Sequence, residues 1–190
     1  MTPTVLATAA LVAAAPTAAF GQQGGAAGAP ARPAPERSGH VEANGVSYYY
    51  EIHGRGEPLL LLHGGLGSLD MFGPVLPALA AGRQVIAVDL HGHGRTALGD
   101  RPLRMIDMGD DLAAVLAELG YEQVGVLGYS LGGGLRDAGW MRENMSPNRL
   151  AILPGRTHYD IFFAPELVST VLPFLNGESN TTDWADQMRR

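Results

Sequence analysis

Cysteine and lysine are both absent from this sequence of 190 residues. The lack of cysteine excludes disulfide bonds, thiolate metal sites and a cysteine nucleophile, although it fits any cellular compartment. All 13 basic residues are arginines, they form no basic cluster, and the net charge is −6. Because nucleic-acid binding needs clustered cations to neutralise phosphates, we expect no nucleic-acid partner.

Metal-binding patterns are also missing. The six histidines do not have the spacing of a zinc motif. Asp107, Asp110 and Asp111 fall at the start of an expected helix, where carboxylates complement the helix dipole, so we do not interpret them as metal ligands. With 46% hydrophobic and 17% charged residues, the composition is that of one globular domain.

No apolar run is long enough to predict a stable membrane span, which needs about 20 strongly apolar residues. The run from Val5 to Phe20 resembles the core of a secretory signal, with Ala19 and Gly21 at the −3 and −1 positions of a cleavage site. We predict a signal peptide over residues 1–21 and export to the periplasm or beyond. Its first four residues carry no Lys or Arg, so a disordered Ala-rich extension is the alternative.

The remaining chain divides by composition. A Gly/Ala/Pro-rich linker is expected over residues 22–38, a folded domain over 39–177 and a polar tail over 178–190. In the domain, Asn44-Gly45 predicts a hairpin within residues 40–53. Apolar runs predict strands, and helical spacing predicts helices between them. The expected strands are 58–62, 84–89, 123–129 and 148–153, and the expected helices are 71–82, 107–119 and 165–175.

Strands that alternate with helices predict an α/β fold with a mostly parallel, doubly wound sheet and helices on both faces. In such sheets ligands bind beyond the carboxyl ends of the strands. The unusual motifs of this sequence all follow a strand, so we expect one functional site at that edge.

The first motif is Gly128-Tyr129-Ser130-Leu131-Gly132, which follows the strand at 123–129. This pattern is typical of a nucleophile elbow, a sharp strand-to-helix turn that exposes the serine Oγ. The turn is strained and its backbones approach closely, which explains the glycines on both sides. Ser130 is therefore the candidate nucleophile.

The second motif, His63-Gly64-Gly65-Leu66-Gly67, follows the strand at 58–62. Acyl transfer places negative charge on a carbonyl oxygen, which backbone N–H groups can stabilise. We predict an oxyanion hole formed by the N–H of Leu131 and that of Gly65, or of Leu66. An ordinary Gly-rich loop is the alternative interpretation.

His158 is the candidate general base. It lies in a loop after the last expected strand, and a serine hydroxyl needs a base to become a good nucleophile. Its position after Ser130 agrees with the Ser–acid–His order of one class of catalytic triad. The alternative is a surface histidine.

Four motifs occur in succession over residues 40–177: His63-Gly64-Gly65, Asp89 to Thr96, Gly128 to Gly132, and Pro154 to His158. Together they resemble the landmarks of the α/β-hydrolase family. This resemblance implies a serine hydrolase of esterase type that acts on small-molecule ester or acyl substrates without a cofactor. A serine in the elbow argues against relatives that use an aspartate nucleophile, such as haloalkane dehalogenases and epoxide hydrolases.

The triad acid and the cap of this family have no counterpart here. Asp137 and Glu143 are the only carboxylates between Ser130 and His158, and neither position gives a geometric reason to act as the acid. Each βαβ unit takes about 30 residues, so the interval cannot hold the two strands that usually follow the elbow. We infer internal loss of strands after the elbow, with the joint near Gly132-Gly133-Gly134. Asp89 is expected to fix its own turn.

Three functions stay open at this point. The first is carboxylic-ester hydrolysis through an acyl-enzyme, with Ser130 and His158 as catalytic residues. The second is a shortened relative that is impaired or not catalytic, because it lacks the acid. The third keeps the enzyme and changes its chemistry to perhydrolysis or carbon–carbon bond hydrolysis, and fold analogy cannot choose among these reactions.

Overall fold

The computed structural model of the chain describes residues 4–11, 32–135, 149–150, 160–164 and 166–176. Its strands are β1 Thr4–Leu11, β2 Arg37–Ala43, β3 Val46–His53, β4 Glu57–Leu62, β5 Arg83–Val88, β6 Gln123–Tyr129 and β7 Arg149–Leu150. Its helices are η1 Leu69–Phe72, α1 Leu76–Ala80, α2 Met105–Glu118, α3 Leu131–Gly134, η3 Ile161–Phe163 and α5 Glu166–Leu175, where η marks a 3₁₀ helix.

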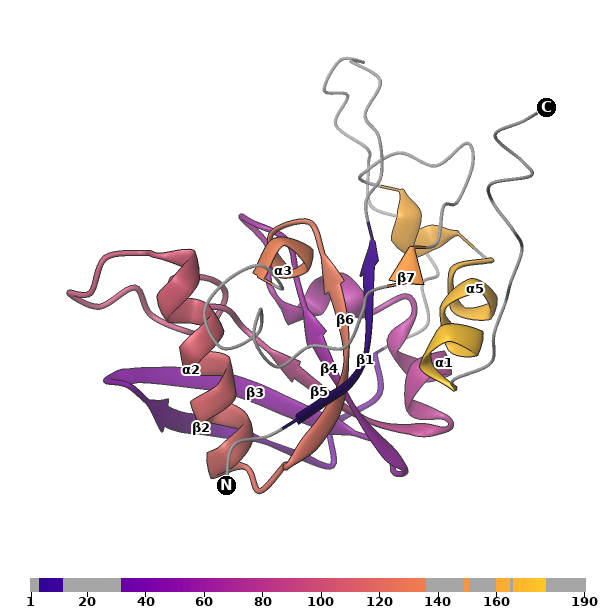
Figure 1. Cartoon of the computed structure of the whole chain (residues 1–190), viewed down its shortest axis with the longest axis horizontal. Coiled ribbons are helices and arrows are strands. Elements are labelled where there is room, and N and C mark those ends of the chain that lie inside the picture. The colour runs from indigo at the N-terminus through magenta and orange to yellow at the C-terminus, as the bar shows by residue number, and fades with distance from the viewer. Residues whose placement is uncertain (1–3, 12–31, 136–148, 151–159, 165, 177–190) are drawn as a thin grey trace, which may run out of the picture.

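The described strands form one sheet in the order β2-β3-β5-β4-β6-β1-β7 (Figure 1). β3 pairs antiparallel with β2 and β5, and every other pairing is parallel. The turn between β2 and β3 uses positive φ at Asn44 and Gly45, which confirms the predicted hairpin. The sheet is therefore mostly parallel, as the alternation of strands and helices predicts.

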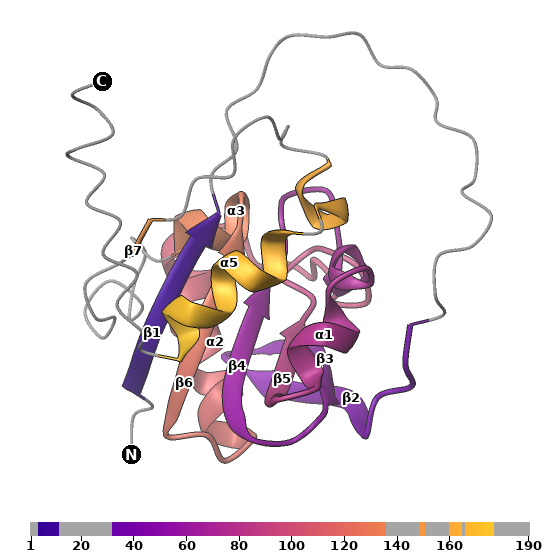
Figure 2. The same ribbon diagram turned by 90° about the vertical axis from the view of Figure 1, so that its right-hand side faces the viewer.

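Helices cover both faces of the sheet, with α2 on one side and α1 and α5 on the other (Figures 1 and 2). The α2 side buries one hydrophobic core, which includes Tyr48, Ile86 and Leu112. The opposite side buries a second core, which includes Leu61 and Phe72. The residues of β4 alternate between these cores, because successive side chains of a strand point to opposite faces. This arrangement confirms the expected three-layer, doubly wound architecture.

The neighbour of β6 in the sheet differs from the sequence expectation. β1 lies between β6 and β7 and pairs in parallel with the whole of β6, from Thr4 opposite Gln123 to Leu11 opposite Tyr129. The sequence predicts a signal peptide over this segment and a folded domain that begins at residue 39. The segment's apolar composition suits a buried parallel strand as well as a signal, so composition alone could not separate the two. Cleavage and export stay predictions.

β1 also changes the expected place of the last strand. If strands are lost after the elbow, the strand at 148–153 must either pair beside β6 or leave the β6 edge exposed. In the structure β7, described at Arg149–Leu150, pairs with β1 instead. The β6 edge that the inferred loss of strands would leave open is thereby covered by β1. This pairing satisfies backbone groups that would otherwise face solvent at an edge.

The expected helix over 71–82 is two short helices, η1 and α1. Gly73 and Pro74 separate them, because proline cannot donate a helical hydrogen bond and glycine is a weak helix former. Helix α2 and the C-terminal helix α5 confirm the expected helices within two residues at each end. Among the described residues, none of the helices has the length and apolarity that crossing a bilayer requires.

A buried carboxylate joins the β2–β3 hairpin to α2. Asp111 accepts hydrogen bonds from the Tyr48 hydroxyl at 2.6 Å and from the Asn44 amide at 2.9 Å. It also forms an ion pair with Arg101. Burial alone would raise the pKa of Asp111, but the hydrogen bonds from these three partners outweigh it, so the pKa lies below its ordinary value. Asp111 is thus ionised and structural.

We expect Asp111→Asn to lower the free energy of unfolding by about 2 kcal/mol at neutral pH, because it removes a buried charge from its partners. A carboxyl whose pKa is lower in the folded state stabilises the fold above about pH 4, and this stabilisation is lost as the pH falls further. The difference between wild type and variant should therefore shrink in acid. Urea unfolding at neutral pH and near pH 3 measures it, and a difference independent of pH would contradict this assignment.

Candidate active site

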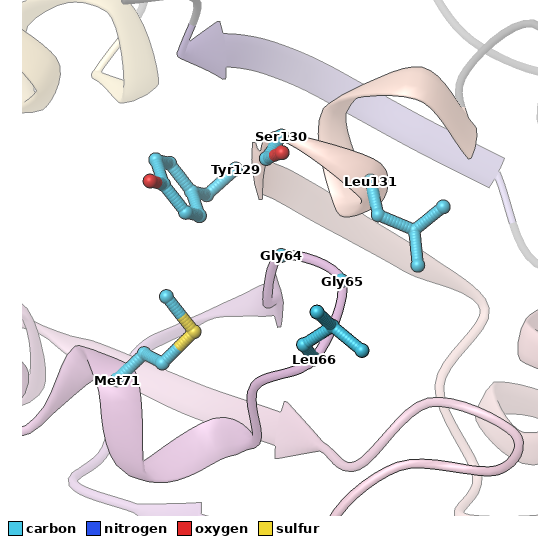
Figure 3. A pocket seen from close by; sticks show the side chains of 7 residues that line it. All are labelled: Gly64, Gly65, Leu66, Met71, Tyr129, Ser130 and Leu131. Carbon is cyan, nitrogen blue, oxygen red and sulfur yellow. The ribbon is translucent and has the colours of Figure 1, made fainter. Parts of the chain in front are cut away.

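A pocket of about 450 Å³ opens at the carboxyl ends of β4 and β6 (Figure 3). The loop after β4, helix η1 and the elbow between β6 and α3 supply its walls. Its lining residues are Gly64, Gly65, Leu66, Met71, Tyr129, Ser130 and Leu131. The pocket thus brings together Ser130 and both predicted oxyanion residues, Gly65 and Leu131, at the edge of the sheet where the site was expected.

Ser130 has the backbone conformation φ 51° and ψ −113°, which L residues rarely adopt. Close packing around the turn explains why Ser130 keeps this unfavourable backbone conformation. A Cβ on Gly128 would lie 2.6 Å from the carbonyl oxygen of Gly132, and a Cβ on Gly132 would collide with the carbonyl of Leu62. Ser130 therefore occupies the strained strand-to-helix turn that its flanking glycines predict.

The loop after β4 approaches this turn closely. The N–H of Gly132 donates to the carbonyl of His63 at 3.0 Å, and a Cβ on Gly64 would lie 2.9 Å from the Tyr129 ring. Gly64 to Gly67 form a turn closed by the Gly67 N–H and the Gly64 carbonyl at 3.3 Å. Leu131 is the first residue of α3, so its N–H has no acceptor within that helix. Its role as an oxyanion donor, and that of Gly65, stay predictions.

His63 fixes the start of this loop. Its Nε2 accepts the N–H of Leu90 at 2.9 Å, so the proton is on Nδ1, which donates to the carbonyl of Gly64 at 2.7 Å. The ring is fully buried, and burial is the main cause that lowers its pKa. His63 is therefore a neutral link between the ends of β4 and β5 that holds the loop in place.

Asp89, at the end of β5, holds its own turn as predicted. Its carboxylate accepts the N–H of Leu69 at 2.7 Å and the N–H of Arg95 at 2.8 Å, and it pairs with the Arg95 guanidinium at 3.1 Å. Arg95 also pairs with Asp70 at 2.8 Å. Asp89 is thus fully engaged in fixing the loops beside the pocket.

The predicted base, His158, lies outside the described residues. So do Asp137 and Glu143, the two carboxylates between Ser130 and His158. The described segment that follows His158 is packed beside the elbow. Phe162 makes edge-to-face contacts with Tyr129, at 4.7 Å between ring centroids, and with Phe72, at 5.3 Å. This aromatic cluster joins residues 160–164 to the wall of the Ser130 pocket.

Two residues that line this pocket were not predicted as site residues. Met71 was expected only as part of the helix over 71–82, and Tyr129 only as part of the elbow motif. The only feature of the sequence that could have indicated a place in the pocket was nearness to a motif: Met71 follows His63–Gly67, and Tyr129 precedes Ser130. No group of three or more His, Asp or Glu side chains that could hold a metal ion occurs in the part of the chain that the structure describes.

Residues 57–135 match a family model described as the alpha/beta hydrolase fold. A protein assigned as carbamate hydrolase RutD, from Azorhizobium caulinodans, is 42% identical over 94 residues, which are 50% of this chain and 36% of that protein. Soluble epoxide hydrolase of Corynebacterium sp. (strain C12) is 40% identical over 47% of this chain and 32% of its own length.

The chain is also similar to solved structures of hydrolases. An epoxide hydrolase from an endophytic Streptomyces has a TM-score of 0.51 and 30% identity, over 57% of this chain and 34% of that one. The fold and the elbow define an α/β-hydrolase scaffold, and residues 57–135 carry the match to that family. The chain spans about a third of the length of the curated relatives it matches.

The close approach at Gly64 gives a test of this geometry. A Cβ at Gly64 meets the Tyr129 ring at 2.9 Å and the Ser130 Cβ at 3.2 Å, whereas one at Gly65 meets only Leu131 at 3.9 Å. We expect Gly64→Ala to lower the free energy of unfolding by about 1–3 kcal/mol through overpacking. Gly65→Ala, the matched control, should be neutral or slightly stabilising. Urea unfolding measures both, and equal effects would refute the packing described for the loop.

Proposed function

We propose that the chain is a serine hydrolase that cleaves carboxylic esters through an acyl-enzyme. The observation that carries this proposal is the position of Ser130: it occupies a strained elbow and lines the same pocket as Gly65 and Leu131. A nucleophile and candidate oxyanion donors around one pocket are two of the parts that acyl transfer needs, and His158 is the proposed third, the general base.

In the proposed mechanism His158 removes the proton of the Ser130 hydroxyl as Oγ attacks the ester carbonyl carbon. The carbonyl oxygen becomes an oxyanion that the N–H groups of Gly65 and Leu131 stabilise. Collapse of this intermediate breaks the bond to the alcohol, which leaves with the proton from His158. Water, activated by His158, then attacks the acyl-enzyme and releases the acid and free Ser130.

The missing acid sets the expected rate. Asp89 is occupied by Leu69 and Arg95, so it is a poor partner for His158. Loss of the acid alone costs about 10⁴-fold in turnover in a serine protease where it was tested. We therefore expect slow turnover of small activated esters, with deacylation slowed as well, since both steps use the same base.

Carbamate hydrolysis is a second candidate for the same site. The observation in its favour is the 42% identity to the protein assigned as a carbamate hydrolase. A carbamate presents the same electrophilic carbonyl to Ser130, so the mechanism needs no new residue. Epoxide opening has less support here, because it offers no carbonyl oxygen for the Gly65 and Leu131 amides to stabilise.

The test is labelling of the folded full chain with a fluorophosphonate, which phosphonylates an activated serine. We expect labelling of the wild type, none of Ser130→Ala, and slower labelling of His158→Ala. Ser47→Ala, at an exposed serine in the hairpin, is the matched control and should label like the wild type. Wild-type protein that is folded by circular dichroism but does not label would favour a relative without catalytic activity.

A further inference from the structure

We propose that Leu66 determines acyl-chain selectivity, so that the pocket prefers esters of longer, uncharged alkyl acids over acetyl esters. This inference rests on the proposed ester hydrolysis and concerns the same pocket. It assigns a substrate class and a specificity-determining residue to the site.

The first observation is the exposure of Leu66. Its relative accessible surface is 103%, which is that of an extended chain, and yet the residue lines the Ser130 pocket. In Figure 3 Leu66 and Met71 line the side of the pocket formed by the β4 loop and η1, and Tyr129, Ser130 and Leu131 line the other. A fully exposed leucine at this position offers apolar surface that a substrate can cover.

The second observation is the backbone conformation of Leu66. Its φ is 61°, in the left-handed region that disfavours a residue of this size. Glycines occupy positions 64, 65 and 67, but the residue that needs positive φ is a leucine. Stability alone would favour Gly or Asn there, and such strain persists mainly where a side chain serves a function.

The third observation is the chemistry of the lining. None of the seven lining residues is charged, and Leu66, Met71 and Leu131 present aliphatic or thioether groups. A charged acyl group would lose its hydration in this pocket without gaining a partner. An alkyl chain that extends along this wall from the substrate's acyl carbon, bound to Ser130 Oγ, covers Leu66, and an acetyl group is too short to do so.

The experiment compares Leu66→Asn with wild type on p-nitrophenyl acetate and p-nitrophenyl octanoate. Asparagine tolerates positive φ, so the melting temperature should be unchanged or higher. The ratio of kcat/KM for octanoate to that for acetate should fall about tenfold, because the apolar contact is lost. Leu98→Asn changes an exposed leucine outside the pocket lining and should leave the ratio within about twofold of wild type.

The outcomes separate the two proposals. Hydrolysis of both esters with an unchanged ratio in Leu66→Asn overturns the role of Leu66 and leaves ester hydrolysis standing. An equal loss on both esters also overturns it, since it indicates damage to the loop and not to chain selection. A folded wild type that hydrolyses neither ester and resists fluorophosphonate labelling overturns ester hydrolysis, and this inference with it.

Discussion

The site depends on the close approach of two backbones, the loop after β4 and the elbow after β6. Gly132 donates to the carbonyl of His63, and a Cβ on Gly64 would lie 2.9 Å from the Tyr129 ring and 3.2 Å from the Ser130 Cβ. This contact fixes Ser130 in a conformation that costs free energy by itself. The buried His63 and Asp89 extend the same constraint to β5, because they tie its end to the loop and to η1. The pocket is the space that these loops enclose above the sheet.

The rest of the fold holds the strands that carry the loop and the elbow by packing on both faces of the sheet. Two hydrophobic cores hold β4, β5 and β6 rigidly between α2 on one face and α1 and α5 on the other. The polar network around Asp111 ties the hairpin to α2 at a distance from the pocket. The strand that carries Ser130 is flanked by β4 and β1, so its backbone is paired on both edges. The part of the chain that matches its curated relatives covers only about a third of their length, and it still assembles the elbow and the loop.

Most of the sheet could be predicted because its signals are local. The Asn44-Gly45 turn, the leucine run of β4 and the glycines around Ser130 each specify their own conformation, and the structure confirms all three. The place of Thr4–Leu11 could not be predicted, since a short apolar run describes a signal and a buried strand equally well, and pairing with β6 is non-local. Leu66 was part of a predicted loop, but its positive φ depends on the turn between Gly64 and Gly67. Met71 lines the pocket from η1, and the sequence alone did not place η1 beside the elbow.

The central claim is that residues 57–135 assemble a reactive serine although the sequence offers no clear triad acid. Acid-quenched mass spectrometry after brief mixing with p-nitrophenyl acetate tests it most directly. The good leaving group p-nitrophenolate keeps acylation faster than deacylation, so the acyl-enzyme accumulates. The account predicts one acetyl group on the peptide that contains Ser130, and none in Ser130→Ala. A folded chain that gains no acetyl group, or that gains it on another residue, would contradict the account.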